Sequence, residues 1–262
     1  SNTTTLSTDT AVARNAITNA ANTKNTIIRN EDEYNNSYSS GINGVGVWVA
    51  KYPGGLGNNL RISVCPTANA YTSTLTGTLA FTNNSTVVTG TGTAFTNQLT
   101  VGDLLVAGPD RAIVKVKTIT NATSVTLASA YVGNTVSTQT VTRRWEYYDY
   151  FSAAPGTSAD AAKYGGSNDE MHIVVADRLG GITGTAETIL ETFPALSKAG
   201  NARSENGTNI HYKNYINQNS RWVWWASHVT GIVGTKTVTS GYTWGTGVQS
   251  KPVNANFQYG RD

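Results

Sequence analysis

The sequence is poor in the residues that build covalent or metal-bound frameworks. It contains 1 cysteine, Cys65, so an intrachain disulfide is excluded. Its 3 histidines stand apart, and none has a second histidine or a cysteine pair at the spacing typical of a zinc site. We therefore expect no metal, and we interpret Cys65 as a small buried hydrophobe within the alternating run Leu60–Cys65.

Charge is also scarce. Charged residues make up 13% of the chain, against about 25% in an average soluble protein. The formal net charge is +3, and the basic residues are scattered, with only Arg143 and Arg144 adjacent. This pattern does not favour nucleic acid or an anionic membrane surface as a direct partner.

Long apolar runs are missing as well. None reaches the roughly 18 residues that a membrane-spanning helix needs, so we expect no membrane insertion. The first residues, Ser1–Thr5, show neither an initiator methionine nor a signal-peptide pattern, which favours a processed product or an excised fragment. Thr, Asn, Ser and Gly are abundant instead, and their short side chains favour turns and strand edges over helix interiors.

The first clear strands flank a turn. Val45–Tyr52 and Leu60–Cys65 are apolar runs separated by Pro53–Gly55, in which proline fixes φ and glycine supplies positive φ. Two such runs around a Pro-Gly loop are expected to lie in one sheet.

Residues 71–142 differ from their surroundings. Short Thr/Val-rich alternating runs are separated by turn signals such as Gly90–Gly92 and Gly108–Asp110. Strands at this spacing predict a small all-β domain, a barrel or a sandwich, and the short length favours a closed barrel. The residues expected to fill its interior are Phe95, Leu99, Val101, Leu104, Leu105, Val106, Ile113, Val116, Ile119 and Leu127.

Mixed signals return after residue 142. Trp145–Phe151 and Met171–Asp177 are predicted strands, and His211–Asn219 has the apolar spacing of an amphipathic helix. The tail from Gly231 shows no closing element. We therefore predict an α+β protein, in which a mixed α/β domain, residues 1–70 and 143–262, is split by an inserted β domain that could be deleted without unfolding the remainder.

Catalytic motifs are not evident. The sequence has no Gly-x-Ser-x-Gly elbow, no phosphate loop and no complete dinucleotide fingerprint. Asp169, Glu170 and His172 could form an acid/base cluster, but carboxylates just before a buried strand more often belong to a solvated loop. We therefore assign no catalytic and no cofactor-binding residue and expect the chain not to be an enzyme.

One aromatic run leaves two interpretations open. Trp222, Trp224 and Trp225 could form a platform for stacking on sugars, together with Trp244. In a strand, however, residues 222–225 would be apolar on both faces, which favours an internal strand. The alternative function, a phage surface module that binds host glycans, requires these tryptophans to be exposed.

Three stretches together resemble the tail sheath proteins of T-even-like contractile phages, of the marine, cyanophage type. The first, Gly44–Leu60, has an apolar strand, Tyr-Pro-Gly and a Leu-Gly turn before the next strand. The second is Ser167–Val175, and the third, Asn209–Trp224, combines Asn-Ile with a helix and an aromatic strand. Residues 71–142 depart from this family and look like a β module recurrent in phage virion proteins.

The resemblance implies the outward-facing middle region of a longer sheath subunit, because the family's C-terminal half is missing. Such a subunit is a virion protein assembled in the host cytoplasm. It would self-associate into a helical sheath, with the tail tube, baseplate and tail terminator as further partners through the missing parts. Contraction draws on better packing between subunits, so the resemblance implies no cofactor.

Overall fold

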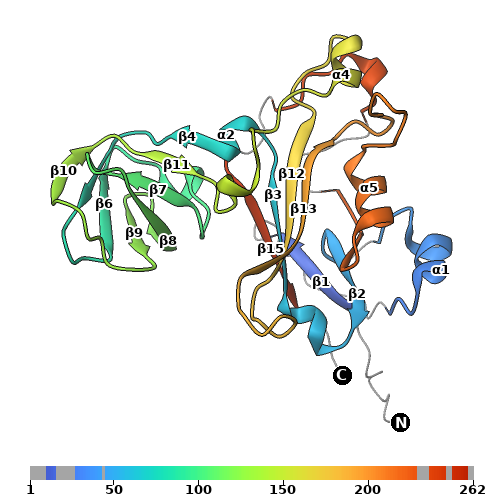
Figure 1. Ribbon diagram of the computed structural model, residues 1–262, viewed down its shortest axis with the longest axis horizontal. Coiled ribbons are helices and arrows are strands. Elements are labelled where there is room, and N and C mark those ends of the chain that lie inside the picture. The colour runs from blue at the N-terminus through green and yellow to red at the C-terminus, as the bar shows by residue number, and fades with distance from the viewer. Residues whose placement is uncertain (1–9, 16–26, 43–44, 229–235, 246–249, 259–262) are drawn as a thin grey trace. The chain divides into compact units, whose positions relative to one another are not determined.

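The computed structural model describes residues 10–15, 27–42, 45–228, 236–245 and 250–258 (Figure 1). The chain divides into two compact units. Unit 1 comprises residues 1–64, 157–247 and 253–262, and unit 2 comprises residues 65–156 and 248–252.

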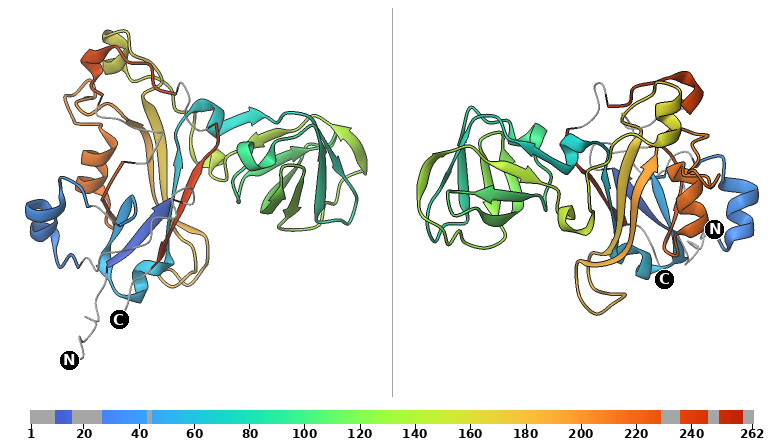
Figure 2. Two further views of the ribbon diagram at one scale, coloured as in Figure 1. Left: turned by 180° about the vertical axis from the view of Figure 1, so that it is seen from behind. Right: turned by 45° about the horizontal axis from the view of Figure 1, so that its top comes forward.

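Unit 1 is built on a seven-stranded sheet in the order β13-β12-β3-β15-β1-β2-β14 (Figures 1 and 2). Both faces of β3 and β12 are covered, because every residue of β3 and every residue of β12 after Glu170 is buried. The strands are β1 (Thr10–Asn15), β2 (Trp48–Pro53), β3 (Leu60–Cys65), β12 (Glu170–Asp177), β13 (Thr188–Ser197), β14 (Val223–Trp225) and β15 (Val253–Gln258).

The helices of unit 1 are short. The longest, α5 (Tyr212–Asn219), packs against the two end strands of the sheet, β13 and β14. The carboxylate of Glu191 on β13 accepts hydrogen bonds from Ser220 Oγ, 2.6 Å, and Arg221 N, 2.7 Å, just before β14. These bonds bring the two ends of the sheet together, so the sheet curls around α5. The remaining helices are α1 (Glu31–Glu33), the π-helix η1 (Tyr34–Tyr38), η2 (Gly55–Asn59), α4 (Ala159–Lys163) and η4 (Val238–Ser240).

Unit 2 holds eight strands in the order β10-β5-β6-β9-β8-β7-β11-β4. Its long strand β8 has register shifts at Val116/Thr118 and Ile119/Asn121, and it pairs with β7 over its first half and β9 over its second. The strands are β4 (Thr72–Thr74), β5 (Thr78–Phe81), β6 (Val87–Thr91), β7 (Leu104–Ala107), β8 (Ala112–Asn121), β9 (Ser124–Leu127), β10 (Val136–Gln139) and β11 (Thr142–Arg144). Short helices α2 (Ala68–Tyr71), α3 (Phe95–Gln98) and η3 (Tyr148–Tyr150) complete it.

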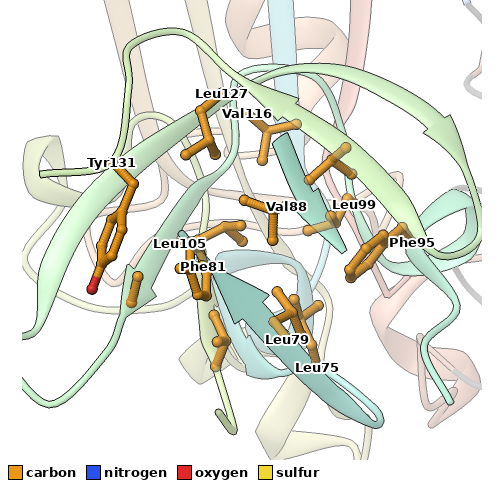
Figure 3. Close-up of a cluster of buried hydrophobic side chains, with 13 residues drawn as sticks. Leu75, Leu79, Phe81, Val88, Phe95, Leu99, Leu105, Val116, Leu127 and Tyr131 are labelled. Atoms are coloured by element: carbon orange, nitrogen blue, oxygen red, sulfur yellow. The ribbon is translucent and has the colours of Figure 1, made fainter. Parts of the chain in front are cut away.

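The core of unit 2 lies between these strands (Figure 3). Five predicted interior residues are fully buried there: Phe95, Leu99, Leu105, Val116 and Leu127. Leu104, Val106 and Ile119 are half-buried. The prediction was wrong for Val101 and Ile113, which are 48% and 52% exposed. Val101 lies in the turn before β7, and Ile113 lies on the outer face of β8, so neither faces the core.

The predicted α+β class is wrong. Both units are mostly β, with antiparallel sheets, and no helix among the described residues exceeds the eight residues of α5. The predicted helix 211–219 forms as α5, but the remaining helices are shorter still, since Thr, Asn and Ser offer the backbone competing hydrogen bonds. The predicted inserted domain, residues 71–142, lies inside unit 2, and its independent folding stays a prediction.

Two further local predictions fail. Trp145–Phe151 does not form a strand but turns into the short helix η3, with the Trp145 and Phe151 rings stacked at 5.2 Å. The tail does have a closing element, because β15 pairs with β3 on one side and β1 on the other. In β15 the buried residues Val253, Ala255 and Phe257 alternate with more exposed ones, as expected for a strand with one buried face.

Candidate functional site

The main cluster of ionisable and aromatic groups in unit 1 surrounds Tyr212, the first residue of α5. The Tyr212 hydroxyl lies 2.5 Å from Nδ1 of His228 and accepts a 3.1 Å hydrogen bond from Nε1 of Trp225. The ring of His211, which precedes the helix, packs edge-on against the Tyr212 ring at 5.0 Å. The cluster therefore joins the start of α5 to the end of β14 through two of the three histidines.

Burial keeps this cluster uncharged. Together with smaller contributions from the nearby His228 and Lys213, it lowers the pKa of His211 to about 4. Burial also lowers the pKa of His228 and raises that of Tyr212. At neutral pH the two imidazoles and the phenol are therefore neutral. The cation of Lys213 stacks on the Trp225 ring with Nζ 4.0 Å from its centroid.

Asp169, one member of the suggested acid/base cluster, has a local structural role. Its buried carboxylate accepts hydrogen bonds from N and Oγ of Ser158, both 2.8 Å, and from Oγ of Ser197. Ser158 is the N-cap of α4, and its Oγ accepts from Ala161 N. Asp169 thus fastens the start of α4 to the end of β13.

The other members, His172 and Glu170, lie on β12. Nδ1 of His172 accepts a 2.9 Å hydrogen bond from the backbone N of Ala195. Ala195 has a φ of 50° and lies where the pairing of β12 with β13 shifts register, so this N–H has left the regular ladder. Glu170 is half-buried at the start of β12. Asp169 and His172 are thus engaged in structural hydrogen bonds, so the suggested acid/base cluster gains no support.

Most of the tryptophans that could stack on a sugar are buried. Trp224 and Trp225 are each 3% exposed and Trp244 is 2% exposed, so their ring faces are not open to a ligand. Trp222 is half-buried, and its ring lies 5.2 Å from that of Tyr52, which is 44% exposed. A glycan-binding role would therefore depend on Trp222 and Tyr52.

Sequence reasoning missed a fully buried charge in unit 2. The guanidinium of Arg143 donates to the carbonyl oxygens of Ala70, 2.7 Å, Asn69, and Ser250, 3.1 Å, and to Oγ of Ser73, 3.0 Å. These groups come from α2, β4 and the returning segment 250–252. The sequence did hold a signal for this burial, because Arg143 lies between Val141 and Trp145 at every second position, and all three are buried.

Asp103 lies beside this arginine, with Oδ2 3.9 Å from Nη1 of Arg143 and 2.8 Å from the donating N of Thr100. Burial raises the pKa of Asp103 to about 7 despite the attraction of Arg143, and burial lowers the pKa of Arg143. Desolvation therefore outweighs the attraction between the two charges. The pair holds chain segments together in an enclosed position rather than facing a ligand.

Among the described residues, no helix is long and apolar enough to cross a membrane, and no three His, Cys, Asp or Glu side chains gather as a metal site would require. What unit 1 does present outward is a small set of exposed apolar side chains: Tyr52, Leu56, Tyr164, Leu179 and Tyr242. These are candidates for contacts with another protein. No protein-family model, curated protein or solved structure matches this chain.

Proposed function

We propose that this chain is a structural, non-enzymatic subunit of a phage contractile tail sheath. It polymerises around the tail tube and rearranges during contraction to drive genome delivery. The observation that carries the proposal is that the three stretches resembling sheath proteins, although far apart in the sequence, belong to one folded body.

The first stretch, residues 44–60, supplies β2, η2 and the start of β3. The second, residues 167–175, supplies most of β12, which is the neighbour of β3 in the sheet. The third, residues 209–224, supplies α5 and most of β14, the neighbour of β2. Residues 71–142, which depart from the family pattern, lie in unit 2.

The internal chemistry of unit 1 also supports a packing role. The carboxylate of Asp169, the imidazole of His172 and the phenol of Tyr212 each bond to a neighbouring chain segment. Groups used in this way stabilise the fold and its rigidity. A lattice subunit that passes force to its neighbours needs such rigidity more than it needs a reactive site.

The partners follow from this proposal. The chain self-associates into a helical array, and the tail tube, baseplate and tail terminator contact parts of a longer subunit. It makes no direct contact with nucleic acid and does not insert into a membrane. It resides in the virion after assembly in the host cytoplasm, and the work of contraction comes from improved contacts between subunits.

Electron microscopy of the parent phage with antibodies against this chain tests the proposal. We expect label along the full length of the tail sleeve, in both extended and contracted particles. Label confined to fibres or baseplate tips, together with a glycan-array signal lost in Trp222→Ala, would favour the glycan-binding alternative. Particles without label would refute both.

A further inference from the structure

The hydroxyl of Tyr212 is enclosed, so the hydrogen bonds that it makes can be assigned one by one. Tyr212 is fully buried, and within the described part of the chain its oxygen has two partners, Nε1 of Trp225 at 3.1 Å and Nδ1 of His228 at 2.5 Å. An indole nitrogen can only donate, so Trp225 uses the hydroxyl oxygen as an acceptor. The hydroxyl proton is then directed at His228, because a buried polar hydrogen is almost always bonded.

This assignment fixes the tautomer of His228. Its Nδ1 accepts the Tyr212 proton and carries none of its own, so the single proton of the neutral ring is on Nε2. The half-buried ring packs against the Trp225 ring at 4.9 Å and the Tyr212 ring at 6.0 Å. A further proton can therefore add only at Nδ1, the atom that faces the hydroxyl.

Protonation at Nδ1 is incompatible with this arrangement. The N–H groups of Trp225 and His228 would then both point at one oxygen, and the Tyr212 proton would lose its acceptor. Two more groups at the start of α5 face the ring. His211 has a pKa of about 4 and is neutral at pH 7, while the Lys213 cation repels a positive charge on His228. The protonated ring is therefore driven away from the hydroxyl.

The backbone before His228 is attached more firmly than its ring. The backbone N atoms of Ala226 and Ser227 both donate to Val47 O, at 2.8 and 3.0 Å, and Gly46 and Val47 carry no charge that would hold an imidazolium. The ring is half-buried, so rotation about its side-chain bonds takes it into water while residues 226 and 227 stay paired. Release is thus a local event.

We propose that Tyr212 and His228 form a proton-operated latch, which fastens the end of β14 to the start of α5 at neutral pH and releases it in mild acid. This inference does not depend on the proposed function. A free imidazole has a pKa near 6.5, and burial lowers the pKa of the latched ring, so release is favoured as pH falls below 6.5. By this linkage the ratio of released to latched chain rises roughly tenfold between pH 7.5 and 5.5.

Nitrogen NMR of the unmodified chain tests the tautomer. Correlations across two bonds distinguish a protonated from an unprotonated ring nitrogen, and the signals of His228 are those that disappear in His228→Gln. At pH 7.5 we expect a proton on Nε2 and none on Nδ1. A proton on Nδ1 at this pH would overturn the latch, because acid would then add its proton at Nε2, away from the hydroxyl.

Solvent exchange of the Trp225 indole N–H tests the release, because departure of His228 uncovers the hydroxyl to which this N–H is bonded. After correction for the intrinsic pH dependence of indole exchange, we expect a roughly tenfold acceleration between pH 7.5 and 5.5. In His228→Gln, whose amide oxygen can still accept from Tyr212 but does not titrate, the acceleration should disappear. In the control, His211→Gln, it should remain, because His211 packs on the Tyr212 ring without bonding to its hydroxyl.

Three exchange results would overturn the inference. Acceleration that persists in His228→Gln would assign the proton to another group, and acceleration that is lost in His211→Gln would assign it to His211. Dilute urea gives the third test, since sensitivity to urea grows with the surface that an opening exposes. If urea speeds Trp225 exchange as much as exchange of the β3 amides, unit 1 unfolds as a whole and no latch opens.

Discussion

The hydroxyl of Tyr34 donates a 2.6 Å hydrogen bond to the carbonyl oxygen of Trp225. It also accepts a 2.9 Å bond from Nδ2 of Asn217, whose Oδ1 accepts a 2.8 Å bond from Trp225 N. Trp225 ends β14, the last strand of the sheet, so these side chains occupy backbone groups on its outer edge. Unpaired N–H and C=O groups on an edge strand can pair with a strand of another chain, and these hydrogen bonds protect the β14 edge from such pairing.

Removing the hydroxyl in Tyr34→Phe should destabilise unit 1 by about 1–3 kcal/mol, because buried partners are left unsatisfied. The stacking of this ring on Trp224, at 5.1 Å, is retained in the variant. Urea denaturation followed by near-UV circular dichroism measures the loss. The matched control, Tyr150→Phe, changes a tyrosine that is 63% exposed and should cost almost nothing. Equal stabilities of the two variants would contradict the role of the hydroxyl.

Acid should weaken unit 1 through His211. Its pKa is about 4 in the folded chain against 6.5 when unfolded, so the unfolded state binds the extra proton between these values. The free energy of unfolding should therefore fall by about 3 kcal/mol as pH drops from 6.5 to 4. Hydrogen exchange of β12 amides, corrected for intrinsic rates, follows this change. In His211→Gln most of this pH dependence of stability should disappear, and only the contribution of His228 should remain. An unchanged pH dependence would refute the role of His211.

Unit 2 should respond to pH in the opposite direction through Asp103. Its pKa is raised from 3.8 to about 7, so the folded state holds the proton that the unfolded state releases. Stability should be greatest below about pH 4 and fall as pH rises to about 7, by a few kcal/mol at most. Exchange of β7 amides reports on this unit. In Asp103→Asn the stability of unit 2 should no longer depend on pH over this range. If the stability of the original chain instead rises between pH 4 and 7, Asp103 is an ionised partner of Arg143 and the prediction is wrong.

The loop after β12 should lose its order in Asp177→Asn. The hydrogen bonds from the loop keep the pKa of this carboxyl low, although burial opposes them, and an amide keeps only part of their acceptor strength. We expect amides of residues 180–183 to exchange at least tenfold faster while β3 amides stay protected. Thr185→Ala, in the same loop, is the control. Unchanged exchange at residues 180–183 would show that the loop is ordered by other contacts.

The sequence allowed the strongly patterned elements to be predicted. β3 matches its predicted range, and β2, β12 and α5 match within a few residues, because apolar periodicity and flanking Pro or Gly are local signals. Fold class was wrong because the helical segments proved too short to form a layer. The pattern could not show that the ends of the sheet meet through Glu191 and Ser220.

The candidate surfaces were harder to foresee. Leu179 belongs to a loop and Leu56 to the short helix η2, neither with a periodic pattern, and only the folded chain shows that Asn59 joins them. The sequence singled out Arg143 only as the neighbour of Arg144, because the four groups that its guanidinium binds lie in the distant segments 69–73 and 250–252. Contacts between distant segments leave no periodic trace in a single sequence.

The position of β15 constrains how the protein can be made. β15 lies between β3 and β1, and Val12 pairs with Gln258, so nearly the whole chain must leave the ribosome before the sheet is continuous. Until then one backbone edge of β3 and one of β1 lack the partner strand that they have in the folded sheet. Slow translation or premature termination would therefore leave half-sheets with unpaired edges, which are prone to aggregate, so chaperones would aid folding at this step.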